Sequence, residues 1–295
     1  MSILPFDDRD GFIWVNGTMV PWRDAKLHIL SHGLHYGGSV FEGERVYDGQ
    51  VFKLKDHGKR LHKSADLLDF EIPFSADVLD EAVKEVVAKQ GVTNGYVRRL
   101  AWRGSEMMAI AAQHNTIHVA IATWSWPNLF AGDSLEKGVR LITADWKRPS
   151  PETAPCQSKA AGLYMICTMS KHKAQKAGYD DAMMLDYRGY VAEATGANIF
   201  FVMDGAVHTP LADCFLNGLT RQTVMGLIKD RGLELVERHI MPEEIANASE
   251  VFLTGSAAEV TPVQSIDDHN YVVGDITKQV IQDYRDLVHV KVAGY

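Results

Sequence analysis

Cysteine is scarce in this 295-residue sequence, and long apolar runs are missing. The three cysteines, Cys156, Cys167 and Cys214, are an odd number without a Cys-x-x-Cys pair, which is typical of a reducing compartment. Apolar runs such as residues 198–203 are far shorter than the roughly 20 residues of a membrane-spanning helix. Residues 1–9 are acidic and lack the basic-then-apolar order of a signal peptide. We therefore expect a cytoplasmic protein with no membrane partner.

An excess of positive charge is also missing. The sequence has 30 Lys and Arg against 38 Asp and Glu, a formal charge of −8, which opposes attraction to a polyanion. We therefore expect no nucleic-acid partner. The closest histidine pairs, His32 with His35 and His114 with His118, have no set of carboxylates or cysteines around them, so we also expect no metal site.

Four familiar enzyme motifs do not occur in the sequence. There is no Gly-x-Gly-x-x-Gly, no Gly-x-x-x-x-Gly-Lys-Ser/Thr, no His-Glu-x-x-His and no Gly-x-Ser-x-Gly. Dinucleotide-binding, P-loop, zinc-protease and serine-hydrolase functions all lose support.

Strand and helix patterns alternate irregularly along the chain. Asn16-Gly17 between apolar stretches predicts a hairpin, because both residues tolerate a positive φ. Further strands are expected at residues 51–54, 96–102, 116–124, 139–143, 182–186, 190–194, 198–203, 234–239 and 251–254. Helices are expected from Asp56 through Leu68, at residues 75–90 and 160–177, after Gly218, and at residues 242–247 and 276–288.

This order of elements predicts an α+β protein with two mixed α/β domains rather than one doubly wound sheet. Pro127, Asn128 and Gly132 interrupt the pattern and mark residues 124–135 as an interdomain linker loop. The N-terminal domain is then residues 1–123 and the C-terminal domain residues 136–295. The cleft between the two domains is the expected place for an active site.

Lys159 is the only charged residue in segment 155–166. Apolar surroundings lower the pKa of a lysine, and the free amine can attack a carbonyl to form a Schiff base. The alternative is a lysine that extends to solvent from the start of a helix, which composition alone favours.

Glu193 is likewise the only charged residue in segment 190–200, at the end of an expected strand. A buried glutamate either pairs with a cation or has a raised pKa, because burial of a lone carboxylate is costly. The alternative is a side chain exposed on a turn.

Three places in the sequence could bind an anion. Gly218-Leu219-Thr220 precedes an expected helix whose first N–H groups would face a phosphate. The small residues 254–258 follow a strand and could offer further N–H donors, and Arg60 could supply a fixed charge. Individually these features also fit a helix cap, a turn and a solvated arginine.

Together, a reactive lysine, a carboxylate and a phosphate-binding segment are the groups that pyridoxal 5'-phosphate (PLP) requires. Its aldehyde needs a lysine, its pyridine nitrogen an acid, and its phosphate hydrogen-bond donors.

Over nearly its whole length the sequence resembles the branched-chain amino acid aminotransferases of PLP fold type IV, the D-amino acid aminotransferase-like fold. The matching segments are residues 32–45, 60–65, 96–98, 155–166, 193–198, 216–221 and 255–263. The resemblance implies a class IV aminotransferase that exchanges the amino group between leucine, isoleucine or valine and 2-oxoglutarate. It also implies a homodimer or higher homo-oligomer, because the family's cleft is completed by a second subunit.

The resemblance also implies roles for individual residues. It places an aldimine at Lys159, an acid at the pyridine nitrogen in Glu193, and Tyr164 beside the ring oxygen. The phosphate would be held by Arg60, Leu219, Thr220 and Ser256. The substrate carboxylate would be bound by Tyr96, Ala257 and Ala258, the side-chain carboxylate of glutamate by Arg98, and apolar side chains by Tyr36, Phe41 and Trp126.

Some residues depart from the family pattern. Arg99 stands where proline is usual, Leu129 where an aromatic residue is frequent, and residues 160–164 replace a glycine-asparagine pattern. Arg99 could be a solvated neighbour or a second carboxylate clamp. The related D-amino acid aminotransferases, (R)-amine transaminases and aminodeoxychorismate lyases remain open, as do a cofactor-free lyase or aldolase acting through Lys159 and a non-catalytic binder of a phosphorylated ligand.

Overall fold

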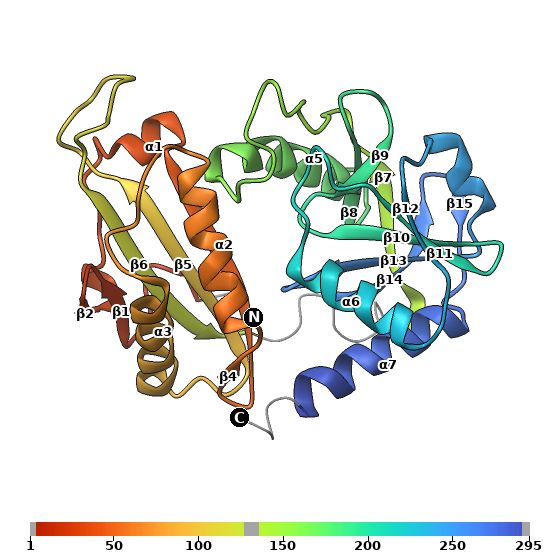
Figure 1. The fold of residues 1–295 in the computed structure, drawn as a ribbon, viewed down its shortest axis with the longest axis horizontal. Helices are drawn as coiled ribbons and strands as arrows, with labels where there is room; N and C mark the ends of the chain where they lie inside the picture. The colour runs from red at the N-terminus through yellow and green to blue at the C-terminus, as the bar shows by residue number, and fades with distance from the viewer. Residues whose placement is uncertain (1–3, 127–135, 291–295) are drawn as a thin grey trace. The chain divides into compact units, whose positions relative to one another are not determined.

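The computed structural model describes residues 4–126 and 136–290, and the chain divides into two compact units (Figure 1). The first unit is Met1–Pro127 with Ser158–Gly162, and the second is Asn128–Gln157 with Leu163–Tyr295. Both units combine helices with strands, so the predicted α+β class is confirmed. Of the expected linker, residues 127–135 lie outside the described residues, and Trp124 and Ser125 end a strand.

A six-stranded sheet is the framework of the first unit. Its order is β2-β1-β6-β5-β3-β4, and neighbouring strands are antiparallel. The strands are β1 (Phe12–Val15), β2 (Thr18–Pro21), β3 (Ser39–Tyr47), β4 (Gln50–Val51), β5 (Gly95–Arg103) and β6 (Ile117–Ser125). The helices are the 3-10 helix η1 (Trp22–Asp24), α1 (His32–Tyr36), α2 (Leu54–Asp66) and α3 (Ala76–Gln90). Figure 1 shows α2 and α3 beside the sheet, and Leu61 and Val83 from these helices share a core with Val97 and Val119 from the strands.

The hairpin prediction is confirmed. Asn16 and Gly17 have φ values of 49° and 97° and form the two-residue turn that pairs Val15 with Thr18. The larger difference from the sequence prediction is β3, which the sequence patterns do not predict. Glu42 and Glu44 interrupt its apolar pattern, yet both are fully buried because they pair with arginines from other elements.

A nine-stranded sheet is the framework of the second unit. Its order is β12-β11-β10-β13-β14-β7-β8-β9, with β15 beside β14. The strands are β7 (Val139–Thr143), β8 (Asp181–Leu185), β9 (Val191–Ala194), β10 (Asn198–Met203), β11 (Ala206–Pro210), β12 (Leu235–Arg238), β13 (Glu250–Gly255), β14 (Glu259–Ile266) and β15 (His269–Asn270). Because β9 also pairs with β10, through Glu193 and Asn198, the strands from β10 to β9 close into a ring. Leu141, Ile199 and Leu253 belong to its apolar core.

The helices of the second unit include three that the sequence predicts. They are α5 (Met165–Lys176), α6 (Leu219–Asp230) and α7 (Asp275–Val290), and the 3-10 helices are η2 (Ala161–Tyr164), shared with the first unit, and η3 (Pro242–Asn247). The expectation of one helix over residues 160–177 is wrong at its start, because Ala160 forms a β-bridge with Val40 and cannot be helical. Within the described residues, no helix is both long enough and apolar enough to cross a membrane.

Candidate active site

The backbone around Lys159 is held by two elements of the first unit. The Lys159 carbonyl accepts a hydrogen bond from the Phe41 N–H of β3 at 3.2 Å. The Lys159 N–H donates to the Ser64 hydroxyl of α2 at 3.0 Å, and the Ser158 hydroxyl donates to the Ser64 carbonyl at 2.8 Å. The segment that carries the lysine is therefore fixed at the edge of β3.

The Lys159 ammonium lies 4.9 Å from the centroid of the Phe41 ring. Burial lowers the pKa of Lys159 to about 8, with a further lowering from the positive charge of Arg60 and an opposing effect from Glu42. With a pKa near 8, about a tenth of the amine is unprotonated at pH 7. The alternative of an extended, solvated lysine is wrong, because the side chain is buried.

Arg60 is fixed by a carboxylate rather than solvated. Its Nε and Nη2 each donate to Glu42 at 2.7 Å, and His57 Nδ1 lies 2.6 Å from Glu42 Oε2. Burial alone would raise the pKa of Glu42, but Arg60 and His57 hold that pKa well below its usual range. Glu42 is therefore a buried, charged anchor between β3 and α2.

Four of the predicted substrate-binding residues lie together in the first unit. The Arg98 guanidinium lies 4.6 Å from the Phe41 ring centroid and 5.7 Å from that of Tyr96. The Tyr96 and Trp126 rings meet edge to face with centroids 4.8 Å apart. Gly43 makes room for this arrangement, since a Cβ there would overlap the Tyr96 hydroxyl. Arg98 Nε is buried and has no hydrogen-bond partner among the described residues.

Two further predictions have different outcomes in this unit. Tyr36 lies on α1, where it is 49% exposed and stacks on His32. Arg99 is neither a solvated neighbour nor a substrate clamp, and both expectations were wrong. It is fully buried and pairs with Glu44 and Asp80 at 2.6 and 2.7 Å. Leu129 lies outside the described residues.

Glu193 lies on β9 of the second unit, directly opposite Asn198 of β10. The Asn198 side-chain amide donates to Glu193 Oε2 at 3.1 Å, and Arg148 Nε lies 3.4 Å from Oε1. Glu193 is only 9% exposed, so the alternative of an exposed turn residue is wrong. An adjacent arginine and an amide donor both favour the ionised carboxylate.

Asn198 connects Glu193 to the start of α6. Its carbonyl oxygen accepts the Gly218 N–H at 3.2 Å, and its amide also donates to the Leu216 carbonyl at 3.1 Å. Gly218 is the N-cap of α6, so Leu219 and Thr220 form the first turn, where backbone N–H groups lack partners within the helix. Sequence analysis gave no role to Asn198, and no local pattern marks it.

The remaining predicted residues lie at two turns of the second unit. Ser256, Ala257 and Ala258 form the turn between β13 and β14, after Thr254, whose buried hydroxyl has no hydrogen-bond partner among the described residues. Tyr164 ends η2 and packs against the cluster that contains Cys167 and Met184.

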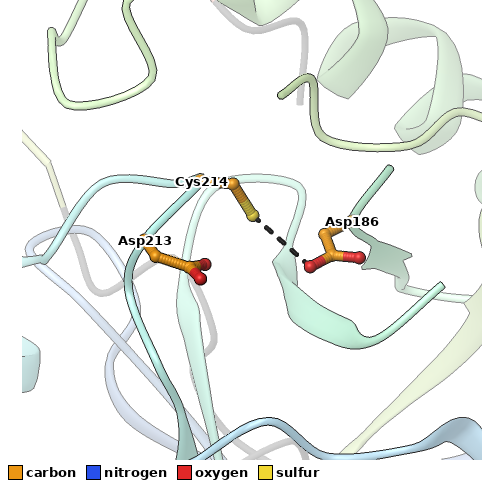
Figure 2. A group of neighbouring side chains, drawn as sticks. All are labelled: Asp186, Asp213 and Cys214. Carbon is orange, nitrogen blue, oxygen red and sulfur yellow. Dashed lines mark hydrogen bonds between the residues drawn. The ribbon is translucent and has the colours of Figure 1, made fainter. Parts of the chain in front are cut away.

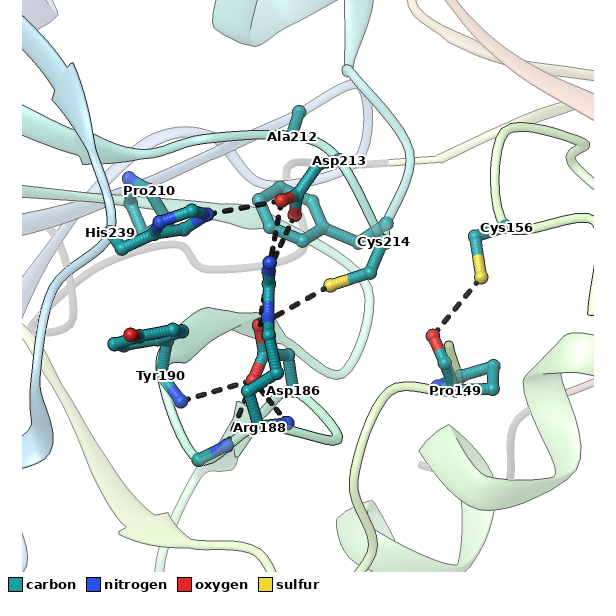
Figure 3. Close-up of polar contacts among 12 residues, drawn as sticks. Pro149, Cys156, Asp186, Arg188, Tyr190, Pro210, Ala212, Asp213, Cys214 and His239 are labelled. Carbon is teal, nitrogen blue, oxygen red and sulfur yellow. Dashed lines mark hydrogen bonds and ion pairs between the residues drawn. The ribbon is translucent and has the colours of Figure 1, made fainter. Parts of the chain in front are cut away.

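A second polar cluster is spatially compatible with a metal ion. Asp186, Asp213 and Cys214 present their ligand atoms within 4.8 Å of one another (Figure 2). Figure 3 shows that Arg188 lies at the same place, with Nη2 2.7 Å from Asp186 and 2.9 Å from Asp213. Burial raises the pKa of the Cys214 thiol, as do both aspartates, so the sulfur is not a thiolate. A guanidinium therefore balances these carboxylates, which fits a structural ion pair.

Comparison with known proteins identifies the family. The sequence model described as "Amino-transferase class IV" matches residues 39–266. The chain belongs to the class IV aminotransferases. The resemblance stated from its sequence is therefore confirmed, and this class IV aminotransferase is an enzyme that transfers an amino group.

Relatives and solved structures agree with this placement. A probable branched-chain-amino-acid aminotransferase of Rickettsia felis is 43% identical over 268 residues, 90% of this chain and 91% of the relative. The crystal structure of the Escherichia coli branched-chain amino acid aminotransferase superimposes with a TM-score of 0.91 at 37% identity, and covers 95% of each chain. The T.th. branched-chain amino acid aminotransferase, solved with N-(5'-phosphopyridoxyl)-L-glutamate and with 4-methylvaleric acid, gives a TM-score of 0.90 in both complexes, at 40% identity and with 95% of this chain and 94% of that chain covered. The predicted PLP fold type IV is thereby confirmed.

Proposed function

We propose that this class IV aminotransferase uses PLP to exchange the amino group between leucine, isoleucine or valine and 2-oxoglutarate. The observation that carries the proposal is the buried Lys159 amine, which has a pKa of about 8 and lies beside Phe41 and the Glu42-Arg60 pair. An amine of this kind is poised to bond to an aldehyde at neutral pH.

The donor set of the chain fits PLP. The phosphate would be bound by Arg60, by Leu219 and Thr220 at the start of α6, and by Ser256, whereas Tyr164 would meet the ring oxygen. Glu193, paired with Arg148 and Asn198, supplies the anion that a protonated pyridine nitrogen needs. When bound, PLP supplies an aldehyde for Lys159 and a cationic ring that withdraws electrons from the substrate α-carbon.

The residues of the chain carry the proton transfer and the substrate recognition. The Lys159 amine takes the proton from the substrate α-carbon and later returns it. Tyr96, Ala257 and Ala258 bind the α-carboxylate. The buried Arg98 Nε, which lacks a hydrogen-bond partner among the described residues, suits the side-chain carboxylate of glutamate.

Phe41, Trp126 and Tyr36 suit a branched apolar side chain. One relative was crystallised both with a phosphopyridoxyl-glutamate and with 4-methylvaleric acid, which has the carbon skeleton of leucine without its amine. An acidic and a branched side chain used alternately by one site is what this exchange requires.

We further propose that a second copy of the chain covers an exposed apolar surface around Tyr36. This surface, which we call the α1 surface, consists of Leu27, Ile29, Leu30, Leu34, Tyr36, Met107, Met108 and Ile110, all at least 40% exposed. His32 Nε2 and the Ala109 carbonyl, 3.0 Å apart, join its two segments. Contiguous exposed apolar residues of this kind are typical of an interaction surface. The proposed compartment is the cytoplasm, which suits the three buried, unbridged cysteines.

A half-reaction panel tests the proposed function. The coloured holoenzyme is mixed separately with L-leucine, L-glutamate, D-alanine and (R)-1-phenylethylamine, and the absorbance of the lysine-bound cofactor is followed. We expect L-leucine and L-glutamate to bleach it, and Lys159→Ala to be unreactive. Bleaching by D-alanine or the amine alone would overturn the branched-chain specificity.

A further inference from the structure

Glu42 makes three hydrogen bonds to two side chains of one helix. Arg60 Nε donates to Oε1, Arg60 Nη2 donates to Oε2, and His57 Nδ1 lies 2.6 Å from Oε2. His57 and Arg60 are three residues apart on α2, so they face the same strand. One carboxylate of β3 therefore fixes both a turn of α2 and the plane of the Arg60 guanidinium.

The burial of the two partners differs. The Glu42 side chain is fully buried, whereas that of Arg60 is 13% exposed. The carboxylate therefore lies on the inner side of the guanidinium and occupies its Nε–Nη2 edge. An anion that meets Arg60 must approach from the Nη1 edge, because a planar guanidinium binds anions along its edges.

We propose that Glu42 is a positioning residue that orients the Arg60 guanidinium for the PLP phosphate, an inference that rests on the proposed function. A buried carboxylate is a costly way to join a strand to a helix, and apolar packing would do so more cheaply. What apolar packing cannot do is fix the plane of a long, flexible cationic side chain before its ligand arrives.

Electrostatics alone gives the opposite expectation. The negative charge of Glu42 repels a phosphate dianion, so a variant that loses this charge would bind PLP more tightly if attraction to Arg60 were the only factor. If orientation matters more than charge, the same variant binds PLP more weakly. The sign of the change therefore decides between the two effects.

Glu44 provides a matched control on the same strand. It lies two residues from Glu42, on the same face of β3, and is also fully buried. It forms a similar two-point pair with Arg99, at 2.6 and 3.0 Å. Glu44→Gln therefore disrupts an equally buried ion pair without touching Arg60.

The experiment compares PLP with pyridoxal, which has the same ring and aldehyde but no phosphate. Dissociation constants of both are measured on the apoenzyme, by the absorbance of the lysine-bound ligand, for wild type, Glu42→Gln, Glu44→Gln, Arg60→Ala and the double variant Glu42→Gln/Arg60→Ala. We expect Glu42→Gln to weaken PLP about tenfold to a hundredfold, as loss of an outer partner does at other sites, and to change pyridoxal by no more than about twofold. Glu44→Gln should leave the ratio of the two constants within about twofold of wild type.

The double variant tests whether Glu42 acts through Arg60. Once Arg60 is alanine, Glu42→Gln should have no further effect on the PLP-to-pyridoxal ratio. An equal change of this ratio in Glu42→Gln and Glu44→Gln, or tighter PLP binding by Glu42→Gln, would overturn the proposal. If Glu42→Gln does not fold, Glu42→Asp, which withdraws the carboxylate by one methylene, replaces it under the same criteria. A wild-type protein that forms no coloured complex with PLP would instead overturn the proposed function.

Discussion

Arg148 and Glu193 form a buried ion pair in which Arg148 Nε lies 3.4 Å from Glu193 Oε1. Asn198 supplies a direct hydrogen bond to the other carboxylate oxygen. Burial lowers the pKa of Arg148, but Glu193 reverses that effect, so that the guanidinium pKa is raised overall. The carboxylate proposed to meet the cofactor ring is therefore already charged and oriented by the protein.

Replacement of Arg148 should destabilise the protein strongly. Arg148→Met leaves Glu193 buried without its cation, and removal of one partner of a buried pair typically costs about 3–5 kcal/mol. Urea unfolding measures this loss, and the double variant Arg148→Met/Glu193→Gln should lose less than the sum of the single variants. Arg285, an exposed residue of α7, supplies the control, and Arg285→Met should change stability by no more than about 0.5 kcal/mol. A loss in Arg148→Met no larger than in the control would contradict the paired arrangement.

The lowered pKa of Lys159 predicts a pH-dependent stability of the apoenzyme. The folded protein binds the proton of Lys159 with a pKa of about 8, against 10.5 for an ordinary lysine. Below pH 8 both states are protonated, and the folded state bears the full cost of the buried charge. Between pH 8 and 10.5 the unfolded state binds more protons, so stability rises with pH.

Lys159→Met removes this dependence. We expect the apo variant to be more stable than the wild type below pH 8, and the difference in unfolding free energy to shrink as the pH rises towards 10.5. Denaturant unfolding at a series of pH values measures it. A constant difference across this range would mean that the Lys159 pKa is ordinary.

A side chain at Gly43 should disturb substrate binding. The Cβ of Gly43→Ala would overlap the Tyr96 hydroxyl, so that the tyrosine ring must move away from its place beside Trp126. A displacement of this size typically lowers kcat/KM by about 10²-fold. Steady-state kinetics with L-leucine measure the loss. Gly226→Ala is the control, because nothing lies within 4 Å of a Cβ at that position of α6, and it should retain wild-type kinetics.

The α1 surface predicts the oligomeric state. Ile110 is 87% exposed and lies in this surface, so Ile110→Glu should weaken self-association. Sedimentation velocity should show a dimer or larger oligomer for the wild type and a shift towards monomer for the variant. Val272→Glu, at a 66% exposed residue of the second unit, should leave the wild-type distribution unchanged. A wild type that sediments as a monomer at micromolar concentration would remove the basis for the proposed dimer.

Local patterns predict those parts of the fold in which neighbouring residues determine the structure. Strands β7 and β10, and the start of α6 after Gly218, occur where periodicity and turn residues place them. Strand β3 does not follow this rule. Its carboxylates are matched by Arg60 and Arg99, which are 18 and 55 residues from their partners, so no local window contains the reason for their burial.

The same limit applies to the site. The uncharged surroundings of Lys159 and Glu193 are visible in the sequence and correctly indicate burial. The groups that orient the proposed site residues, namely Glu42, Arg148 and Asn198, come from other elements and become evident only in three dimensions. For Arg99 the sequence offers solvent or substrate as partners, whereas Glu44 and Asp80 are its actual partners.

The ring of strands in the second unit is sealed by a single residue pair, Glu193 with Asn198. The seam of this barrel and the proposed acid of the reaction are thus the same few atoms. An opening of the barrel at this point would remove the carboxylate from its arginine and its amide at once. Coenzyme release and unzipping of the barrel should therefore be one cooperative event, so that the colour of the enzyme reports directly on whether this part of the protein is folded.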